Sequence, residues 1–504
     1  MRRRGALPAL AGPLLIAACG TTVPMSQLPA SGAALGGPDA AQAGADTALV
    51  GGSRATRTGA TGSGTHSGAA GTSAVPGGEQ PVAAPSALPG GVPGGETGRG
   101  FTRTTIQIGI ADSDVNSYAT TLGVKGIATG DETAQVDAVV SSINRSGGLL
   151  GRKIELVWYH ASSAQELNNP SVVDEEACAT WTQDHHVYAV VGPIGIPVDR
   201  DMLACLAKTH TPVMGAGNPW GLDTAPYFQQ LYDAFPDFVN VDSMLGETLY
   251  RITVARLVAR NFFEPWDTSR GAPATGTVKP PVKVGVVIHD NPNGERQLAV
   301  LTQELAKYGI KITDVARLSG GVTQTSADAQ NAALRFHSDG ITHELGTAAM
   351  DFAEGQKYRP RYFVPNEPQL IAANVPKGQL QGAMSESYIP ALDVADDPGP
   401  PTTATTQCLK LMRDAHQDTS SGSARFVMES ICDGFFFLRS AVTASGSLSR
   451  LTSGLEALGS RVPAAMTWET HLSPRQHASA SALRDVGYDN GCSCFRYTSN
   501  RSYS

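Results

Sequence analysis

From Phe101 onward, short runs of aliphatic and β-branched residues alternate with longer stretches in which apolar positions recur every three to four residues. The short runs predict strands at Ile106–Ile110, Ile154–Trp158, Tyr188–Val191 and Pro212–Met214. The longer stretches predict helices at Glu132–Arg145, Val172–Thr182 and Asp199–Lys208. Strands that alternate with helices favour a parallel sheet covered on both faces. Residues 101–238 are therefore predicted to form a first α/β lobe.

The same alternation begins again after a long helical stretch, Val241–Phe262, and a loop rich in Pro and Gly, Pro265–Pro281. The strands expected here are Val282–Ile288, Lys311–Thr313, Ile341–His343 and Tyr362–Val364, and the helices are Gly294–Tyr308 and Ala327–Phe336. We predict that residues 239–381 form a second lobe of the same kind. The fold class is then α/β, with two doubly wound parallel-sheet lobes.

The chain begins with a different pattern. Arg2, Arg3 and Arg4 precede an apolar run that is too short to span a bilayer, which is typical of a secretory signal peptide. The string Ile16–Cys19 resembles a bacterial lipobox, in which the cysteine thiol is alkylated by a diacylglycerol and becomes the first residue of the mature protein. We expect residues 1–18 to be a lipoprotein signal peptide and Cys19 to anchor the chain at the extracytoplasmic face of the cell membrane. The alternative is an ordinary signal peptide cut near a chance cysteine.

Residues 19–100 consist mainly of Gly, Ala, Ser, Thr and Pro, with few charges and almost no aromatic residues. Such a composition buries too little apolar surface to offset the entropy of ordering, so it predicts a disordered tether. The 504 residues carry a net charge of -8, which argues against a nucleic-acid-binding surface because such surfaces need clustered Lys and Arg.

Besides Cys19, six cysteines occur, an even number that favours disulfides in an exported protein. Six cysteines allow 15 pairings, and the sequence does not choose among them. We expect each to pair with its neighbour along the chain: Cys178 with Cys205, Cys408 with Cys432, and Cys492 with Cys494. The rival interpretation is a zinc site, but neither Cys-x-x-Cys pairs nor suitably spaced His residues accompany these cysteines. We therefore expect no metal.

One motif connects the first lobe to a known family. The strand Ile106–Ile110 and the stretch Ile143–Leu156, which contains Asn-x-x-Gly-Gly-Leu-x-Gly-Arg, resemble the opening of type I periplasmic binding proteins of the Leu/Ile/Val-binding family. Val190–Pro193, Thr211–Val213 and the Gly487-Tyr488 region add to the resemblance, which covers essentially Ile106 to the C-terminus.

The resemblance implies a Venus-flytrap fold in which the chain passes between the lobes three times. Residues 382–460 would return to the first lobe, with Gly382–Tyr388 as the returning strand, and residues 461–504 would lie at the hinge or in the second lobe. It also implies the substrate-binding component of an ABC-type importer, with an ABC permease as partner and a small polar solute of the branched-chain amino acid or amide-like class as ligand. We expect a monomer without enzymatic activity or cofactor. The alternative is an exported enzyme or a structural cell-envelope lipoprotein on a similar α/β frame.

In such a fold, ligand contacts come from the residues that follow the strands. In the first lobe these are Asp112, Ser113, Pro193, Ile194, Gly195, Ala216, Gly217 and Asn218; in the second lobe they are Asp290, Asn293, His343, Glu344 and Glu367. Glycines allow backbone N–H groups to approach a ligand carboxylate, and the acidic side chains would accept from an ammonium or hydroxyl group.

The search for catalytic arrangements gave one weak candidate. His343–Thr347 begins like a zinc-protease helix, but Thr347 stands where that motif requires a second His. We therefore expect no catalytic residue, whereas the enzyme alternative predicts a convergent catalytic group between the lobes.

Overall fold

The computed structural model describes residues 95–113, 116–117, 119, 124–162, 165, 170–192, 200–215, 238–241, 243–319, 322–365, 367–395, 398–459, 462, 464–473 and 476–504. The predicted signal peptide, Cys19 and most of the predicted tether lie outside these residues. The end of the tether is an exception, because residues 95–100 make specific contacts. The Glu96 carbonyl accepts from Arg152 at 2.8 Å, and Arg99 donates to the Thr182 carbonyl at 2.9 Å. These residues therefore belong to the folded part.

A five-stranded sheet of order β2-β1-β3-β4-β5, with every neighbouring pair parallel, forms the first lobe. Its strands are β1 (Thr105–Ser113), β2 (Lys153–Ala161), β3 (Ala189–Val191), β4 (Val213–Gly215) and β5 (Phe238–Asn240). β1 and β2 pair along their whole length, from Thr105 opposite Lys153 to Ser113 opposite Ala161. The carboxyl ends of these strands therefore lie at one edge of the sheet.

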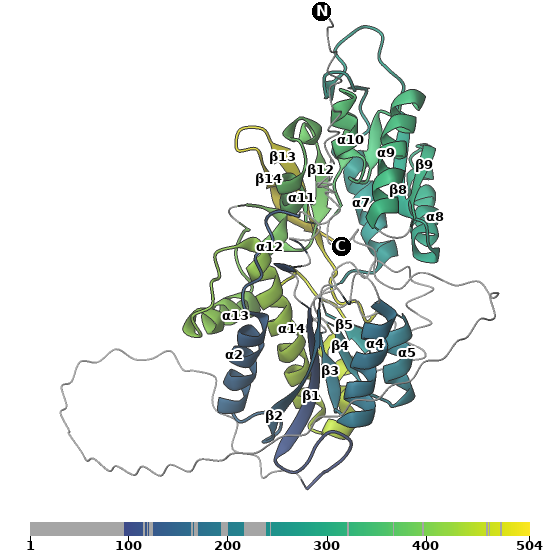
Figure 1. Ribbon diagram of the computed structural model, residues 1–504. Helices are drawn as coiled ribbons and strands as arrows, with labels where there is room; N and C mark the ends of the chain where they lie inside the picture. Colours follow the sequence, from purple (N-terminus) through teal and green to yellow (C-terminus); the bar gives the residue numbers. More distant parts are fainter. Residues whose placement is uncertain are drawn as a thin grey trace, which may run out of the picture. The chain divides into compact units, whose positions relative to one another are not determined.

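Helices cover both faces of this sheet (Figure 1). One face packs against α2 (Glu132–Arg145), α13 (Thr403–Asp414), α14 (Gly422–Ser445), η4 (Leu448–Arg450) and α15 (Leu451–Leu458). The other face packs against α4 (Pro170–Ala179), the π-helix η2 (Thr180–Asp184) and α5 (Arg200–Lys208). Because α13, α14 and α15 come from the C-terminal third of the chain, the first lobe is discontinuous in sequence.

A seven-stranded sheet of order β14-β13-β12-β11-β10-β8-β9 forms the second lobe. Its strands are β8 (Val284–His289), β9 (Ile312–Leu318), β10 (His343–Leu345), β11 (Arg361–Phe363), β12 (Met384–Ser387), β13 (Leu483–Asp489) and β14 (Cys494–Tyr503). The strands from β8 to β12 are parallel to their neighbours, whereas β13 and β14 are antiparallel additions at one edge.

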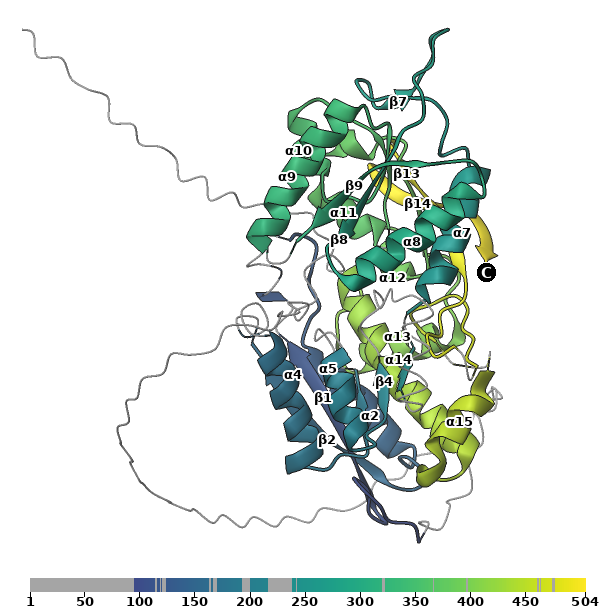
Figure 2. The same ribbon diagram turned by 90° about the vertical axis from the view of Figure 1, so that its right-hand side faces the viewer.

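Helices also cover both faces of the second sheet, as Figure 2 shows. They are α7 (Gly246–Ala259) and α8 (Pro292–Ala306) on one face, and α9 (Val322–Asp339), α10 (Met350–Gly355), α11 (Pro368–Asn374) and the 3-10 helix η3 (Lys377–Leu380) on the other. The short helix α12 (Pro390–Asp393) follows β12. The segment expected as a loop, Pro265–Pro281, contains a small hairpin of β6 (Trp266–Asp267) and β7 (Ala272–Pro273).

One expectation about the chain path is corrected. The stretch Gly382–Tyr388 was expected to return to the first lobe, but its strand β12 lies in the second sheet. β12 pairs with β11 through Met384 opposite Phe363, and with β13 through four residue pairs that end at Ser387 opposite Arg484. The chain therefore returns to the first lobe only after β12. β12 stays in the second sheet because it pairs there with β13 of the C-terminal hairpin.

Two of the connections between the sheets run side by side. The amide of Asn240, the last residue of β5, donates to the carbonyl of His477 at 2.9 Å, and the amide of Ser479 donates back to the carbonyl of Asn240 at 3.0 Å. The amide of Ala480 donates to the carbonyl of Ser243 at 3.0 Å. The connection that leaves β5 is thus paired with the connection that leads into β13.

The glycine-containing motif that carries the family resemblance stabilises the first lobe. The Asn144 side chain accepts from the amide of Ile154 at 2.7 Å and donates to the carbonyl of the same residue at 3.0 Å, which ties α2 to β2. Gly148 has φ +69°, and a Cβ atom there would lie 1.9 Å from the Arg152 carbonyl oxygen, so only glycine fits. The buried Arg152 guanidinium donates to the Thr102 carbonyl at 2.7 Å. In this chain the motif therefore joins α2, β2 and the segment before β1.

The three predicted disulfides are confirmed: Cys178–Cys205, Cys408–Cys432 and Cys492–Cys494. The first joins α4 to α5, and the second joins α13 to α14. Both thus connect helices of the first lobe. In the part of the chain that the structure describes, no helix combines the length and the apolar character needed to cross a bilayer.

Candidate functional site

The carboxyl edge of the first sheet presents an anchored carboxylate. Asp112 lies near the end of β1, directly opposite His160 of β2, and its Oδ1 is 2.6 Å from His160 Nδ1. Thr133, in the first turn of α2, donates to the other carboxylate oxygen at 3.3 Å. The indole of Trp158 stacks on the His160 ring, with centroids 5.3 Å apart. Asp112 and Ser113 were expected to follow the strand, but they are the last two residues of β1, at its carboxyl end.

The other first-lobe candidates, Pro193, Ile194, Gly195, Ala216, Gly217 and Asn218, lie outside the described residues. The strands that lead to them are described. β3 ends at Val191, and the amide of Gly192 then donates to the carbonyl of Met214 at 3.0 Å. β4 ends at Gly215, opposite Asn240 of β5. Both strands thus end at the edge that carries Asp112.

In the second lobe, Asp290 follows β8 as predicted, and its amide donates to the carbonyl of Leu318 at 2.9 Å. The next residue, Asn291, caps α8, because its side chain accepts from the amide of Gly294 at 2.8 Å. Asn293 lies in the first turn of α8. Asp290 therefore stands at the carboxyl edge between β8 and β9.

His343 and Glu344 are placed differently from the prediction. The prediction made His343 the last residue of its strand and put Glu344 after it, whereas both lie inside β10 and are fully buried. His343 packs against Phe262 and Phe263, and burial lowers its pKa to about 3. Neither carboxyl oxygen of Glu344 has a hydrogen-bond partner among the described residues, and burial raises its pKa to about 8. The strand begins two residues later than the apolar pattern indicated, which moves both side chains from the edge into the sheet.

A buried pair of carboxyl groups follows β11 and β12. Glu367 has a left-handed backbone, φ +56°, directly before α11, and it is 0% exposed. Its two carboxyl oxygens find no partner in the described part of the chain, and burial followed by the nearby charge of Asp393 raises its pKa well above the usual value. Asp393 ends α12 and accepts from the Tyr497 hydroxyl at 2.6 Å. Burial raises the pKa of Asp393 to about 6, although the hydrogen bond from Tyr497 opposes that shift.

Of this group, only Glu367 was predicted from the sequence. Asp393 was missed because β12, which it follows, was assigned to the other lobe. Tyr497 was missed because it lies on a strand far along the chain, and no local pattern places that strand beside α12.

A segment of the first lobe contacts the helix that Glu367 precedes. The amide of Lys125 donates to Asn374 Oδ1 at 2.7 Å, and Asn374 Nδ2 donates back to the carbonyl of Lys125 at 2.9 Å. The amide of Ala128 donates to Ser423 Oγ, at the start of α14, at 2.9 Å. The segment between β1 and α2 thus connects α11 of the second lobe with α14 of the first.

Three cavities formed by described residues have volumes of about 790, 600 and 160 Å³. None of the predicted ligand residues lines them. Within the described ranges, no three His, Cys, Asp or Glu side chains are grouped closely enough to hold a metal ion.

No protein-family model matches this chain, and no curated protein matches it. Solved structures do. An ABC transporter substrate-binding protein from Desulfitobacterium hafniense in complex with Leu is 15% identical, with a TM-score of 0.52, and the match covers 78% of this chain and 99% of that chain. A solute-binding protein of an ABC transporter from R. palustris in complex with 4-hydroxybenzoate is 11% identical, with a TM-score of 0.54 and coverages of 79% and 97%.

A branched chain amino acid ABC transporter protein from Thermus thermophilus with bound valine is 10% identical, with a TM-score of 0.55 and coverages of 80% and 96%. At these identities the likeness concerns the fold. The predicted two-lobed α/β fold of type I periplasmic binding proteins is therefore confirmed.

Proposed function

We propose that the protein is an extracytoplasmic solute-binding protein, the substrate-binding component of an ABC importer, and that it binds a small polar solute between the carboxyl edges of its two sheets. The observation that carries this proposal is the unpartnered, fully buried carboxyl group of Glu367 at the edge of the second sheet. In open parallel sheets, ligands bind outside the carboxyl ends of the strands. Asp112 occupies the corresponding edge of the first sheet.

The chemistry of this edge favours a ligand with a hydrogen-bond donor. A buried carboxyl group without a partner costs about 1–3 kcal/mol, and a ligand ammonium, amide or hydroxyl group would remove that cost. The ligands named for the three solved structures each carry such a donor, an ammonium group in leucine and valine and a phenolic hydroxyl in 4-hydroxybenzoate. We therefore assign the ligand to the class of branched-chain amino acids and their amides, with Glu367 as acceptor for the donor group.

Attachment to the membrane completes the proposal. A lipid on Cys19 and the Gly-rich segment after it would keep the binding lobes near a permease, and the protein would act as a monomer. The alternative function is an exported enzyme on the same frame, which would convert its ligand rather than release it unchanged.

The test is thermal unfolding of the full-length protein, disulfides intact, with leucine, valine, leucinamide and 4-hydroxybenzoate. Ligand at about a hundred times its dissociation constant stabilises the folded state by about 2.7 kcal/mol, which raises the unfolding midpoint measurably. Glu367→Gln should weaken binding at least about tenfold, which is the effect of losing about 1.4 kcal/mol. Glu344→Gln is the matched control, because Glu344 is equally buried but lies inside β10.

Absence of a saturable shift with all four compounds would contradict the proposal, and so would equal shifts in wild type and Glu367→Gln. Recovery of chemically altered compound after incubation would favour the enzyme alternative.

A further inference from the structure

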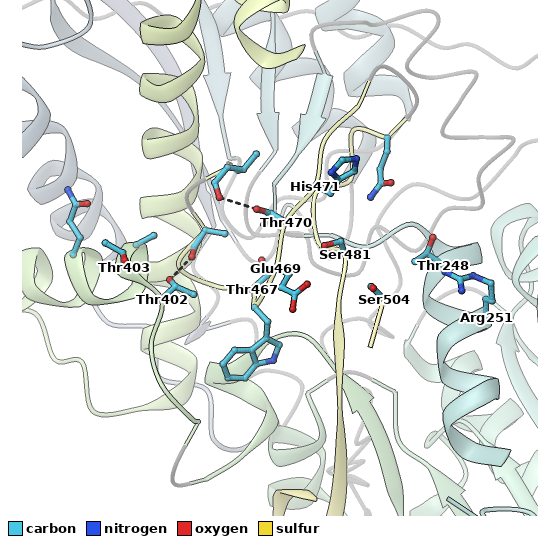
Figure 3. Close-up of a pocket in the computed structure, with 16 residues that line it drawn as sticks. Thr248, Arg251, Thr402, Thr403, Thr467, Glu469, Thr470, His471, Ser481 and Ser504 are labelled. Carbon is cyan, nitrogen blue, oxygen red and sulfur yellow. Dashed lines mark hydrogen bonds between the residues drawn. The ribbon is translucent and has the colours of Figure 1, made fainter. Parts of the chain in front are cut away.

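A cavity of about 790 Å³ is lined by residues other than those proposed to bind the solute (Figure 3). Its walls come from α7, from the start of α13 and from the segment between Val462 and Ser481. We refer to it as the α7–α13 cavity. Thr402 and Thr467 lie on one side of it, and Thr248 and Arg251 of α7 lie across from them. Asp112 and Glu367 do not line this cavity.

The wall that contains Thr467 and Trp468 is held from two directions. The amides of Ala465 and Met466 donate to the carboxylate of Asp433 on α14, at 2.5 and 2.9 Å. On the other side, Thr405 Oγ1 of α13 donates to the carbonyl of Ala465 at 2.8 Å. The main chain that presents the next two side chains is therefore fixed before any ligand arrives.

Trp468 itself is fixed by stacking. The guanidinium carbon of Arg484 lies 3.5 Å from the centroid of the indole, and the Tyr497 ring meets the indole edge-on with centroids 5.6 Å apart. Arg484 covers one face of the indole, and the indole Nε1–H group is left to find a hydrogen-bond acceptor elsewhere.

Two consecutive polar side chains that line the cavity lack partners. Thr467 is 1% exposed, and neither its Oγ1 nor Trp468 Nε1 has a hydrogen-bond partner among the described residues. Leaving a buried donor unsatisfied costs about 1–3 kcal/mol. Two such groups in neighbouring positions on a rigid wall, beside a large cavity, indicate a site that is completed by a ligand.

The lining identifies the ligand class. The opposite charges of Arg251 and Glu469 disfavour a strongly charged ligand, because either sign would meet one like charge. Gln407 and Gln476 each offer an amide donor and an amide acceptor, and the unpartnered Thr467 hydroxyl serves as both. A molecule that donates and accepts hydrogen bonds at many positions matches this wall. An apolar ligand would leave the polar groups of the wall without hydrogen-bond partners.

We propose that the α7–α13 cavity binds a neutral, multiply hydroxylated small molecule, a sugar or a polyol, with Thr467 and Trp468 as two of its hydrogen-bonding groups. This site is separate from the solute site at the strand ends and does not depend on it.

The test is isothermal titration calorimetry of the full-length protein with four probes: glucose, galactose, ribose and myo-inositol. We expect saturable binding of at least one probe, and at least tenfold weaker binding of that probe to Thr467→Val and to Trp468→Phe. Thr467→Val removes one unpartnered polar atom and keeps the side-chain shape. Trp468→Phe removes the indole N–H together with one ring and keeps an aromatic ring for stacking on Arg484. Thr253→Val is the matched control, because the Thr253 hydroxyl is also buried and unpartnered but lies outside the cavity.

Glu367→Gln should leave probe binding unchanged, which separates this site from the solute site. The proposal is overturned if none of the four probes binds saturably, or if Thr467→Val and Trp468→Phe bind as wild type does. Tighter binding of inorganic phosphate or acetate than of all four probes would overturn the assignment to a neutral ligand.

Discussion

Three buried glutamates of the second lobe differ in whether the fold supplies a partner. Glu386 of β12 has one, because the Arg260 guanidinium lies 2.5 Å from its carboxylate. Glu344 and Glu367 have none among the described residues. Without a partner, a buried carboxyl group avoids the cost of its charge by keeping its proton. A protonated, unpartnered Glu367 is consistent with the proposed role in ligand binding. Glu344 lies inside β10, so its buried carboxyl group is expected to affect the stability of the fold and not ligand binding.

Glu344→Gln is expected to reduce the dependence of stability on pH. Burial raises the pKa of Glu344 to about 8 in the folded state, from the usual value of about 4.5 for a solvated glutamate. The folded state therefore binds more protons between these pH values, and the free energy of unfolding falls as the pH rises through this window. The fall attributable to Glu344 is on the order of 4 kcal/mol, and the glutamine variant lacks it.

The measurement is urea unfolding of wild type and Glu344→Gln at pH 5 and pH 8. Two other groups near Glu344 have raised pKa values: the charge of Glu344 contributes to that of Tyr362, and burial raises that of Asp351 to about 6. Both residues are left unchanged in the wild type and the variant, so the comparison isolates Glu344. Equal losses of stability between the two pH values in wild type and variant would contradict the prediction.

At the scale of elements, α7 is held to the C-terminal side of the second sheet by two arginines. Arg256 forms a two-pronged ion pair with Asp485 of β13, at 3.0 and 2.7 Å, and Tyr503 of β14 lies under its guanidinium at 3.7 Å. Arg260, at the end of the helix, pairs with Glu386 and donates to the carbonyl of Val486 at 2.8 Å. These contacts join a helix from the middle of the chain to its last strands.

Arg260→Met should lower the free energy of unfolding by about 3–5 kcal/mol at pH 8, because it leaves the carboxylate of Glu386 buried without its partner. Burial raises the pKa of Glu386 to about 7 even with Arg260 present, so the loss should be smaller at pH 6. Adding Glu386→Gln removes the stranded charge. The double variant should therefore be more stable than the sum of the two single changes, by about 1–3 kcal/mol in denaturant unfolding. Strictly additive losses would show that the two side chains do not interact.

Local sequence signals were sufficient for some elements and insufficient for others. The predicted bounds of α2 match the structure because its start and end are set locally, by the Asp131 cap and by Gly147-Gly148. β5 was missed because its three residues lead almost directly into the helical stretch predicted from Val241. α14 was missed because its middle is buried on every side and has no polar face to mark a period.

The candidate site shows the same division. Asp112 and Asp290 lie two residues after apolar runs, and Glu367 lies three residues after the run Tyr362–Val364, so their places near strand ends were predictable. The juxtaposition of Glu367 with Asp393 depends on which sheet β12 joins, and that choice depends on β13, about a hundred residues later. Whether Glu367 and Asp393 meet is therefore decided by the order of the strands in the sheet and not by the sequence around either residue.

At the scale of the whole molecule, the alternation of strands and helices was enough to predict two α/β lobes, but not the interleaving of the chain between them. The first lobe is completed by α13, α14 and α15, and the Cys408–Cys432 disulfide fixes the first two of these to each other. Disulfides persist mainly in oxidising compartments outside the cytosol. The two disulfides between helices of the first lobe therefore agree with the proposed export of the protein.

Cys19→Ser should release the protein from the membrane into the soluble fraction, because the lipid is joined through the cysteine sulfur and serine offers no thiol for that bond. The measurement is fractionation of cells into membrane and soluble material, followed by immunoblotting. Ser26→Ala, a change in the same segment, is the control and should leave the protein in the membrane fraction. Because acyl chains on one residue would supply the whole attachment, a serine variant that stays in the membrane fraction would refute the anchor. Solute binding by the released variant should be unchanged, since the lobes begin some 75 residues later.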